Sequence, residues 1–267
     1  MVSGVLEPMR LAAMSQPRRS MRDPELSNED RMAIFIEQGH VLLEGVVGST
    51  AYGLAGPESD VDYLGLYAAP TADFHGLHPP LGKMASVVLK DPDRTYHEAL
   101  KYVQLVMGGN PTVTELLWLE EYTSFQHFGL ELASNRLRLL SARRVRESYL
   151  GYATSQFVRL VNRGDGSFSA DLRKRTAKHA RHLLRLLDQG FELYSTGKLT
   201  IRLEDPERYH DFGQRVADGD HEIAKDELHR SELRFDRVRT VLLERPDEKY
   251  VENWLRRLRR QYMESDD

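Results

Sequence analysis

The sequence predicts an α+β fold, in which a small β-sheet with flanking helices is followed by a helical region. Two periodicities support this assignment. Short apolar segments bounded by turn residues are typical of buried strands, and they occur at residues 41–47, 63–67 and 84–90. From about Tyr96 onward the pattern is mostly helical, with breaks near Pro111 and Pro206.

Three regions are expected along the chain. Residues 1–27 contain several prolines and arginines with little periodicity, which is typical of a mobile leader. Residues 28–125 hold the predicted strands and should form the core, which opens with a helix that ends near Gly39. Residues 126–267 are expected to form a mainly helical C-terminal region.

Composition restricts the classes of function. The chain of 267 residues contains no cysteine, which excludes disulfides, zinc–thiolate sites and thiol nucleophiles. Its formal net charge is −4, so any contact with nucleic acid must come from a local basic patch. No apolar stretch approaches the roughly 20 residues that cross a bilayer, and no apolar signal core begins the chain. We therefore expect a cytoplasmic protein with no membrane partner.

The most informative segment, residues 48–62, joins a small-residue turn to two carboxylates. A predicted strand precedes it and another follows it. In extended backbone, residues i and i+2 project from the same face, so Asp60 and Asp62 should point together. Gly48 allows close approach of a ligand to the backbone, and Ser49 with the next amides, at the start of a short helix, can donate hydrogen bonds to phosphate oxygens.

These features predict phosphoryl or nucleotidyl transfer. Two carboxylates crowded on one face repel each other unless a cation joins them. Magnesium takes one or two protein carboxylates and completes its shell with substrate phosphates and water. An isolated Asp-x-Asp pair is more often a turn or a solvated edge, but a glycine–serine turn with strands on both sides favours a metal and phosphate site.

The segment resembles the signature of the DNA polymerase β nucleotidyltransferase superfamily, a Gly-Ser turn followed by an Asp-x-Asp pair, here Gly48, Ser49, Asp60 and Asp62. The Gly-Asn-Pro-Thr segment at residues 109–112 resembles one branch, the RlaP-type predicted nucleotidyltransferases associated with RNA repair ligases. The resemblance implies a small mixed β-sheet nucleotidyltransferase core. It also implies Mg²⁺, with Mn²⁺ as an alternative, an NTP substrate (ATP by default), and transfer to an acceptor hydroxyl for which an RNA end is one candidate.

By the same resemblance, a third carboxylate should come from a later strand and hold a second metal ion. Asp93 is the first candidate for this catalytic and metal-binding position, Glu98 is the second and Asp91 is the third. Turn chemistry explains Asp91 and Asp93 equally well, and Glu98 suits the first turn of a helix. The sequence leaves this choice open.

A basic helix is expected from about residue 172 to residue 190. Lys178, Arg181 and Arg185 are spaced to share one face, and beside a triphosphate they would neutralise its β- and γ-phosphates. A solvated basic face is the ordinary explanation of such a stripe. Glu115 lies in an apolar stretch and needs a partner, which favours a structural ion pair.

Two alternative functions remain open from the sequence. A protein-modifying, NMPylating (antitoxin-like) enzyme would place the same site opposite a hydroxyl of a partner protein. A non-catalytic nucleotide-binding module would keep the fold and one metal ion. The arginine-rich helix near residues 254–262 could contact RNA phosphates, but nearby acidic residues favour pairing within the chain.

Overall fold

The computed structural model describes residues 27–37, 40–57, 59–161 and 170–263. Residues 1–26, which make up almost all of the predicted leader, lie outside the described residues. No helix within the described ranges is long and apolar enough to cross a membrane.

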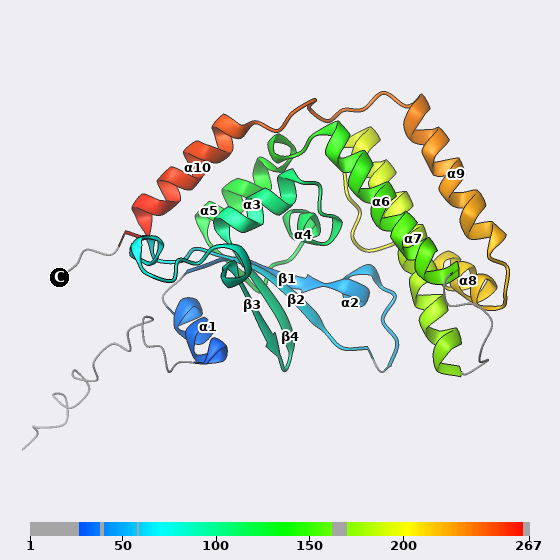
Figure 1. Cartoon of the computed structure of the whole chain (residues 1–267), viewed down its shortest axis with the longest axis horizontal. Coiled ribbons are helices and arrows are strands. Elements are labelled where there is room, and N and C mark those ends of the chain that lie inside the picture. Colours follow the sequence, from blue (N-terminus) through cyan, green and yellow to red (C-terminus); the bar gives the residue numbers. More distant parts are fainter. Residues whose placement is uncertain (1–26, 38–39, 58, 162–169, 264–267) are drawn as a thin grey trace, which may run out of the picture.

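A five-stranded mixed sheet forms the centre of the N-terminal half (Figure 1). Its spatial order is β3-β4-β2-β1-β5, and only the β2–β4 pair is parallel. The strands are β1 (Val41–Val47), β2 (Asp62–Tyr67), β3 (Ser86–Lys90), β4 (Asp93–Glu98) and β5 (Ser124–Phe125). The predicted α+β class with a small mixed sheet is therefore confirmed.

Helices surround the sheet and make up nearly all of the regular structure after it. They are α1 (Asn28–Glu37), α2 (Gly48–Tyr52), α3 (Ala99–Met107), α4 (Pro111–Glu115), α5 (His127–Ser134), α6 (Ala142–Val161), α7 (Ala170–Thr196), α8 (Pro206–Ala217), α9 (Glu222–Arg237) and α10 (Glu248–Gln261). Four short 3-10 segments are η1 (Thr71–His75), η2 (Gly82–Ala85), η3 (Leu116–Trp118) and η4 (Arg136–Leu139).

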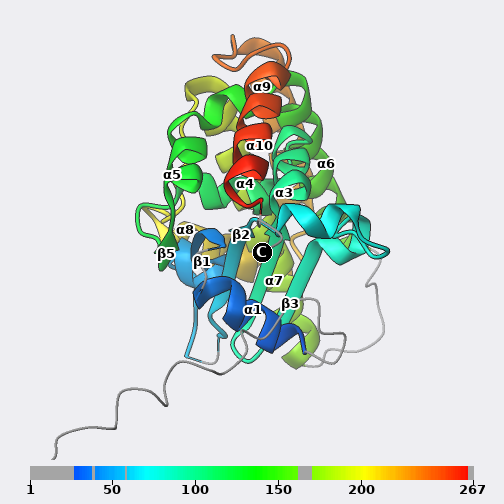
Figure 2. The ribbon, with the colours of Figure 1, turned by 90° about the vertical axis from the view of Figure 1, so that its left-hand side faces the viewer.

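The two faces of the sheet contact different helices. On one face, Met32 and Phe35 of α1 pack with Tyr67 and Tyr96 in a small cluster. On the other face, β2 contributes to a large hydrophobic core that also includes residues of α3, α5, α6 and α7. Figure 2 shows α1 on one side of the sheet and α3, α4 and α5 on the opposite side. The alternation of side chains along β2 produces this two-sided packing.

The C-terminal helices extend the same core. Helices α6 and α7 pack along each other beside α2, while α10 crosses back over the N-terminal half (Figure 1). The fully buried Trp254 of α10 donates a hydrogen bond from Nε1 to the carbonyl oxygen of Phe128, at 3.1 Å. The hydrophobic cluster is continuous from Leu42 in β1 to Leu258 in α10.

One local expectation was wrong. The chain does not become helical at Tyr96, because β4 continues to Glu98 and pairs with β2 from Arg94 to Glu98. The predicted break near Pro111 is present after α3 ends at Met107, and Asn110 and Pro111 begin the next helix. The Asn110 side chain accepts a hydrogen bond from the Val113 amide at 3.1 Å, and Pro111 occupies the first turn of α4, where its missing N–H has no cost.

Candidate functional site

The turn between β1 and α2 requires a glycine. Gly48 has a φ of 69°, in the left-handed region that side chains rarely adopt. A Cβ atom placed on Gly48 would lie 2.4 Å from Oδ2 of Asp62, because Val47 and Asp62 are paired across β1 and β2. The predicted glycine turn and one predicted aspartate are therefore in direct contact.

The parallel pairing of β2 and β4 brings a second aspartate to this position. Asp62 begins β2 and Asp93 begins β4, each one residue before the registered pair Tyr63–Arg94. Partial burial raises the pKa of the Asp62 carboxyl, and the neighbouring charge of Asp93 raises it further. Sheet topology therefore places the first-choice third carboxylate beside the Gly48 turn.

Asp60 and Lys178 also lie within electrostatic reach of Asp62. Asp60 is exposed in the irregular segment before β2, and its charge raises the pKa of Asp62 by less than that of Asp93 does. Lys178 is exposed on α7, and its ammonium group lowers the same pKa. The site therefore contains three carboxylates and one cation from four separate segments.

The three carboxylates offer oxygen ligands, but their side chains are not already arranged around a position for a metal ion. The side chains of Asp60, Asp62 and Asp93 make no hydrogen bond or ion pair with any other described residue. Among the residues that the structure describes, no three acidic or histidine side chains are arranged so that they could hold a metal ion. Two neighbouring carboxylates nevertheless match what Mg²⁺ takes from a protein, since phosphates and water complete its shell.

Glu98, the alternative third carboxylate, is not at the site. It lies at the other end of β4, roughly 16 Å along the strand from Asp93. Its side chain is fully buried, pairs with Arg259 of α10 at 2.8 Å, and accepts a hydrogen bond from the Leu100 amide at 2.8 Å. Glu98 therefore caps α3 and anchors α10, which corrects its proposed role as a metal ligand.

The three predicted phosphate-binding cations have different surroundings. Lys178 is exposed beside the carboxylates, as described above. Arg181 is half-buried against Gly213 of α8, and its guanidinium has no hydrogen bond or ion pair with a described residue. Arg185 is only 1% exposed and pairs with Glu115 at 2.6 Å, and this burial argues against its predicted role in binding a nucleotide. The helical spacing predicted a shared face but not how deep each position lies.

Comparison with known protein families gives a match that covers most of the chain. A family model described as the RNA repair pathway DNA polymerase beta family (RlaP) matches residues 25–210. This match includes the Gly48 turn, all three aspartates and Lys178. The chain belongs to this family. No curated protein matches the chain.

The description of the RlaP family indicates a polymerase β-like nucleotidyltransferase of an RNA repair pathway. Tyr52, the last residue of α2, is a residue for which the sequence suggested no role. The Tyr52 hydroxyl donates a hydrogen bond to Oε2 of Glu115 at 2.6 Å, and the guanidinium of Arg185 lies 3.9 Å from the centre of its ring. The expected structural ion pair at Glu115 is confirmed, with Arg185 as its partner. The position of Tyr52 at the end of the short helix after Gly48 was the only available signal.

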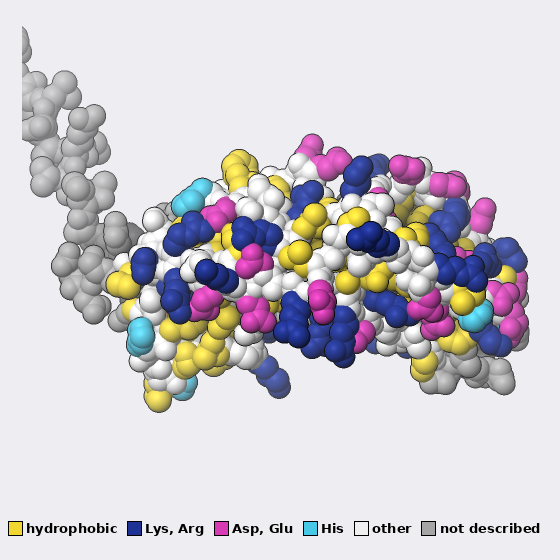
Figure 3. Space-filling model, turned by 90° about the horizontal axis from the view of Figure 1, so that it is seen from above, with side chains coloured by type: hydrophobic (Ala, Val, Ile, Leu, Met, Phe, Trp, Pro, Cys, Tyr) yellow, Lys and Arg dark blue, Asp and Glu magenta, His cyan; other side chains and the backbone are white. Residues whose placement is uncertain are grey.

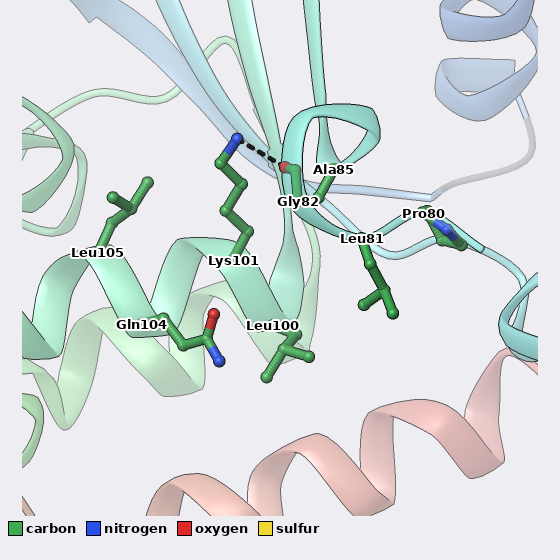
Figure 4. A pocket seen from close by; sticks show the side chains of 8 residues that line it. All are labelled: Pro80, Leu81, Gly82, Ala85, Leu100, Lys101, Gln104 and Leu105. Carbon is green, nitrogen blue, oxygen red and sulfur yellow. Dashed lines mark hydrogen bonds between the residues drawn. The ribbon is translucent and has the colours of Figure 1, made fainter. Parts of the chain in front are cut away.

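One cavity of this RlaP-family protein is separate from the aspartates. It has a volume of about 290 Å³ and lies between η2 and α3, where Lys101 donates a hydrogen bond to the carbonyl oxygen of Gly82 (Figure 4). Ser86, directly after η2, pairs with His97 at the far end of the β3–β4 hairpin from Asp93. This cavity is therefore not part of the candidate site.

The arginine-rich helix α10 pairs largely within the chain. Arg257 pairs with Glu131 of α5, and Arg256 pairs with Glu252 at 2.8 Å. On the face seen in Figure 3, basic and acidic side chains are intermixed and do not form a patch of one sign. This arrangement supports intramolecular pairing over a strong nucleic-acid surface at α10.

Proposed function

We propose that the protein is a magnesium-dependent nucleotidyltransferase that transfers a nucleoside monophosphate from an NTP to an acceptor hydroxyl. The observation that carries the proposal is the position of Asp62. Its carboxylate contacts the Gly48 turn and interacts with Asp93 and Lys178. One location therefore combines a backbone turn open to phosphate, neighbouring carboxylates and a cation.

The residues present fit a divalent cation. Asp62 and Asp93 repel each other, and no described residue pairs with either carboxylate, so a cation between them would relieve the repulsion. Asp60, whose charge acts on Asp62, is the candidate for a further oxygen ligand. A bound Mg²⁺ would polarise phosphoryl oxygens and offset the negative charge of the triphosphate. Mn²⁺ prefers the same oxygen ligands and is the expected substitute.

The remaining residues would bind and orient the triphosphate. Gly48 leaves space beside Asp62, and the Ser49 hydroxyl, which has no hydrogen-bond partner among the described residues, can donate to a phosphate oxygen. Lys178 and Arg181 are the proposed partners of the outer phosphates, since neither has an acidic partner in the described part of the chain. Arg185 is excluded from this role by its burial.

The proposed reaction forms one bond and breaks one. The acceptor hydroxyl oxygen attacks the α-phosphorus, and the bond from that phosphorus to the bridging oxygen of the β-phosphate breaks. The leaving group is pyrophosphate, and the hydroxyl proton passes to Asp93, the more exposed of the two strand aspartates. Asp62 would be the main ligand of the cation, and the cation would offset the charge of the triphosphate beside the Gly48 turn.

An RNA end is the preferred acceptor because the family is named for an RNA repair pathway. The test is incubation of the full chain with each α-³²P-labelled NTP and Mg²⁺, with single-stranded RNA carrying a free 3′ hydroxyl, and separately with protein extract. Transfer to RNA that depends on Mg²⁺ and disappears in the Asp62→Asn variant supports the proposal.

Other outcomes select the alternatives. Label on protein and none on RNA would identify the protein-modifying function. Tight NTP binding without transfer to any acceptor would identify a nucleotide-binding module. Undiminished transfer by a double Asp60→Asn, Asp62→Asn variant would overturn the assignment of the site.

A further inference from the structure

A buried polar cluster of three side chains lies behind the candidate site. Glu115 of α4 is 1% exposed and Arg185 of α7 is 1% exposed, and they pair at 2.6 Å. Tyr52, the last residue of α2, donates to the other oxygen of Glu115 at 2.6 Å and lies under the guanidinium of Arg185. Both carboxylate oxygens are therefore occupied, each by a different helix.

The cluster holds α2 at its C-terminal end. The main chain of Tyr52 is also fixed, because its carbonyl oxygen accepts a hydrogen bond from the Leu203 amide at 3.1 Å. Gln189 connects the same region, since it accepts from Arg185 at 2.5 Å and donates to the Thr200 carbonyl oxygen at 2.8 Å. The five-residue helix α2, too short to be stable alone, is thus fixed by tertiary contacts.

The same cluster fixes α7 relative to α2. Arg185 lies seven residues, or about 10 Å, along α7 from Lys178, and the two positions share one face. Gly48 lies at the opposite end of α2 from Tyr52. A shift of either helix at the Tyr52–Arg185 contact would therefore change the distance between the Gly48 turn and Lys178.

We propose that Glu115 is a positioning residue, which holds the Gly48 turn and Lys178 at the spacing that a triphosphate requires by binding Tyr52 and Arg185 at the same time. This inference rests on the proposed function. Stability alone gives a weaker explanation of the cluster, because well-packed apolar residues often replace a buried ion pair without loss of stability. An ion pair whose carboxylate also accepts a hydrogen bond from α2, the helix that follows the Gly48 turn, specifies geometry.

The structure offers a matched pair of substitutions. Tyr52→Phe removes the hydroxyl that bonds Glu115 and keeps the ring beneath Arg185. Tyr149→Phe removes a hydroxyl from α6, at a residue that is also buried and lies in the electrostatic field of the same Glu115 and Arg185. This hydroxyl has no hydrogen-bond partner among the described residues. Each variant loses one oxygen atom, but only Tyr52→Phe removes a hydrogen bond between α2 and Glu115.

The test measures steady-state kinetics of transfer and backbone hydrogen exchange in both variants. We expect Tyr52→Phe to raise the KM for the NTP and to lower kcat/KM by up to about 100-fold, because small displacements of reacting groups have effects of this size. The KM for the acceptor should be unchanged. Exchange of the amides in residues 49–53 should accelerate, and exchange in β1 should not. Tyr149→Phe should match wild type in every respect.

Glu115→Gln provides a second measurement. The amide keeps one oxygen acceptor but removes the charge that Arg185 requires, so the KM for the NTP should rise at least as much as in Tyr52→Phe. Thermal unfolding of each variant shows whether the protein assayed is folded.

Equal kinetics and equal exchange in Tyr52→Phe and Tyr149→Phe would overturn the inference. Failure of the proposed function has a different signature, namely wild-type protein that transfers no label. In that case faster exchange in residues 49–53 of Tyr52→Phe would still support the positioning of α2 by Glu115, and unchanged exchange would reject it.

Discussion

Asp62 and Asp93 begin two neighbouring parallel strands, so their carboxylates lie at the same edge of the sheet although they are distant in the sequence. An antiparallel partner would have placed Asp93 at the opposite edge. The arrangement follows from the order of the strands, in which β4 reaches β2 only after the β3–β4 hairpin has reversed the chain. Because the two carboxylates belong to different strands, each can be substituted and assayed separately.

The first prediction compares the two ends of β4. Asp93→Asn should reduce transfer by at least about 100-fold, since it removes a proposed metal ligand, and even the hydrogen-bond partners of metal ligands contribute 10- to 100-fold. Without metal, it should leave stability equal to or above that of wild type, because a repulsion with Asp62 disappears. Glu98→Gln should instead lower the free energy of unfolding by about 1–3 kcal/mol through the lost charge opposite Arg259.

Activity assays and urea unfolding of the two variants check this prediction. The kcat of folded Glu98→Gln should equal that of wild type. If Glu98→Gln lost transfer while Asp93→Asn retained it, the third carboxylate would have been assigned to the wrong end of the strand.

The second prediction concerns two glycines at the ends of α2. Gly48 and Gly53 both have left-handed backbone, with φ values of 69° and 76°. A Cβ on Gly48 would lie 2.4 Å from Asp62, whereas on Gly53 the nearest atom would lie 3.9 Å away. Each alanine substitution should therefore cost about 1–2 kcal/mol of backbone strain, but only Gly48→Ala should displace Asp62.

Thermal unfolding and NTP titrations with Mg²⁺ distinguish the two glycine variants. Similar losses of stability are expected, with loss of NTP binding confined to Gly48→Ala. Equal NTP affinity in both variants would show that the space beside Asp62 is not used.

The third prediction concerns the proposed partner of the outer phosphates. Lys178→Gln should raise the KM for the NTP roughly tenfold, and the effect should shrink as salt rises because the lost interaction is between charges. Lys198→Gln is the control, since Lys198 is exposed just after the far end of α7, about 30 Å along the helix axis. Kinetics at two ionic strengths check this expectation, and identical KM values for the two variants would contradict it.

Local sequence signals predicted β1, β2 and the Gly48 turn well, but they missed β4 and β5. Apolar segments bounded by turn residues located β1 and β2, and the small residues after Val47 located α2. These features depend on residues that are adjacent in the chain. The choice between Asp93 and Glu98 depends instead on which end of β4 lies beside Asp62. Strand pairing determines this, and local sequence signals do not reveal it.

Burial was the second property that local signals did not predict. Lys178 and Arg185 share a helical face, yet one is exposed and the other is enclosed between α4 and α2. The depth of each position depends on the crossing of α7 with other elements. Glu115 was the exception. A carboxylate inside an apolar stretch requires a buried partner in any fold, so its ion pair could be predicted from the sequence.

The fourth prediction concerns acid stability. Burial, with a smaller contribution from Lys101, lowers the pKa of His97 to about 4. The unfolded chain, in which histidine has its ordinary pKa near 6.5, therefore binds a proton more readily than the folded protein. The stability that His97 contributes is complete above pH 6.5 and is lost as the pH falls toward 4. His97→Gln should remove roughly 1–3 kcal/mol of the stability difference between pH 7 and pH 4.5.

Urea unfolding at several pH values between 7 and 4.5 measures this dependence. His75→Gln is the control, because His75 is exposed and makes no hydrogen bond or ion pair with a described residue. Other buried histidines, such as His182 with a pKa of about 3, act equally in both variants and in wild type. The His97→Gln curve should therefore be flatter than the other two. Parallel curves for all three proteins would show that His97 titrates alike in the folded and unfolded chains.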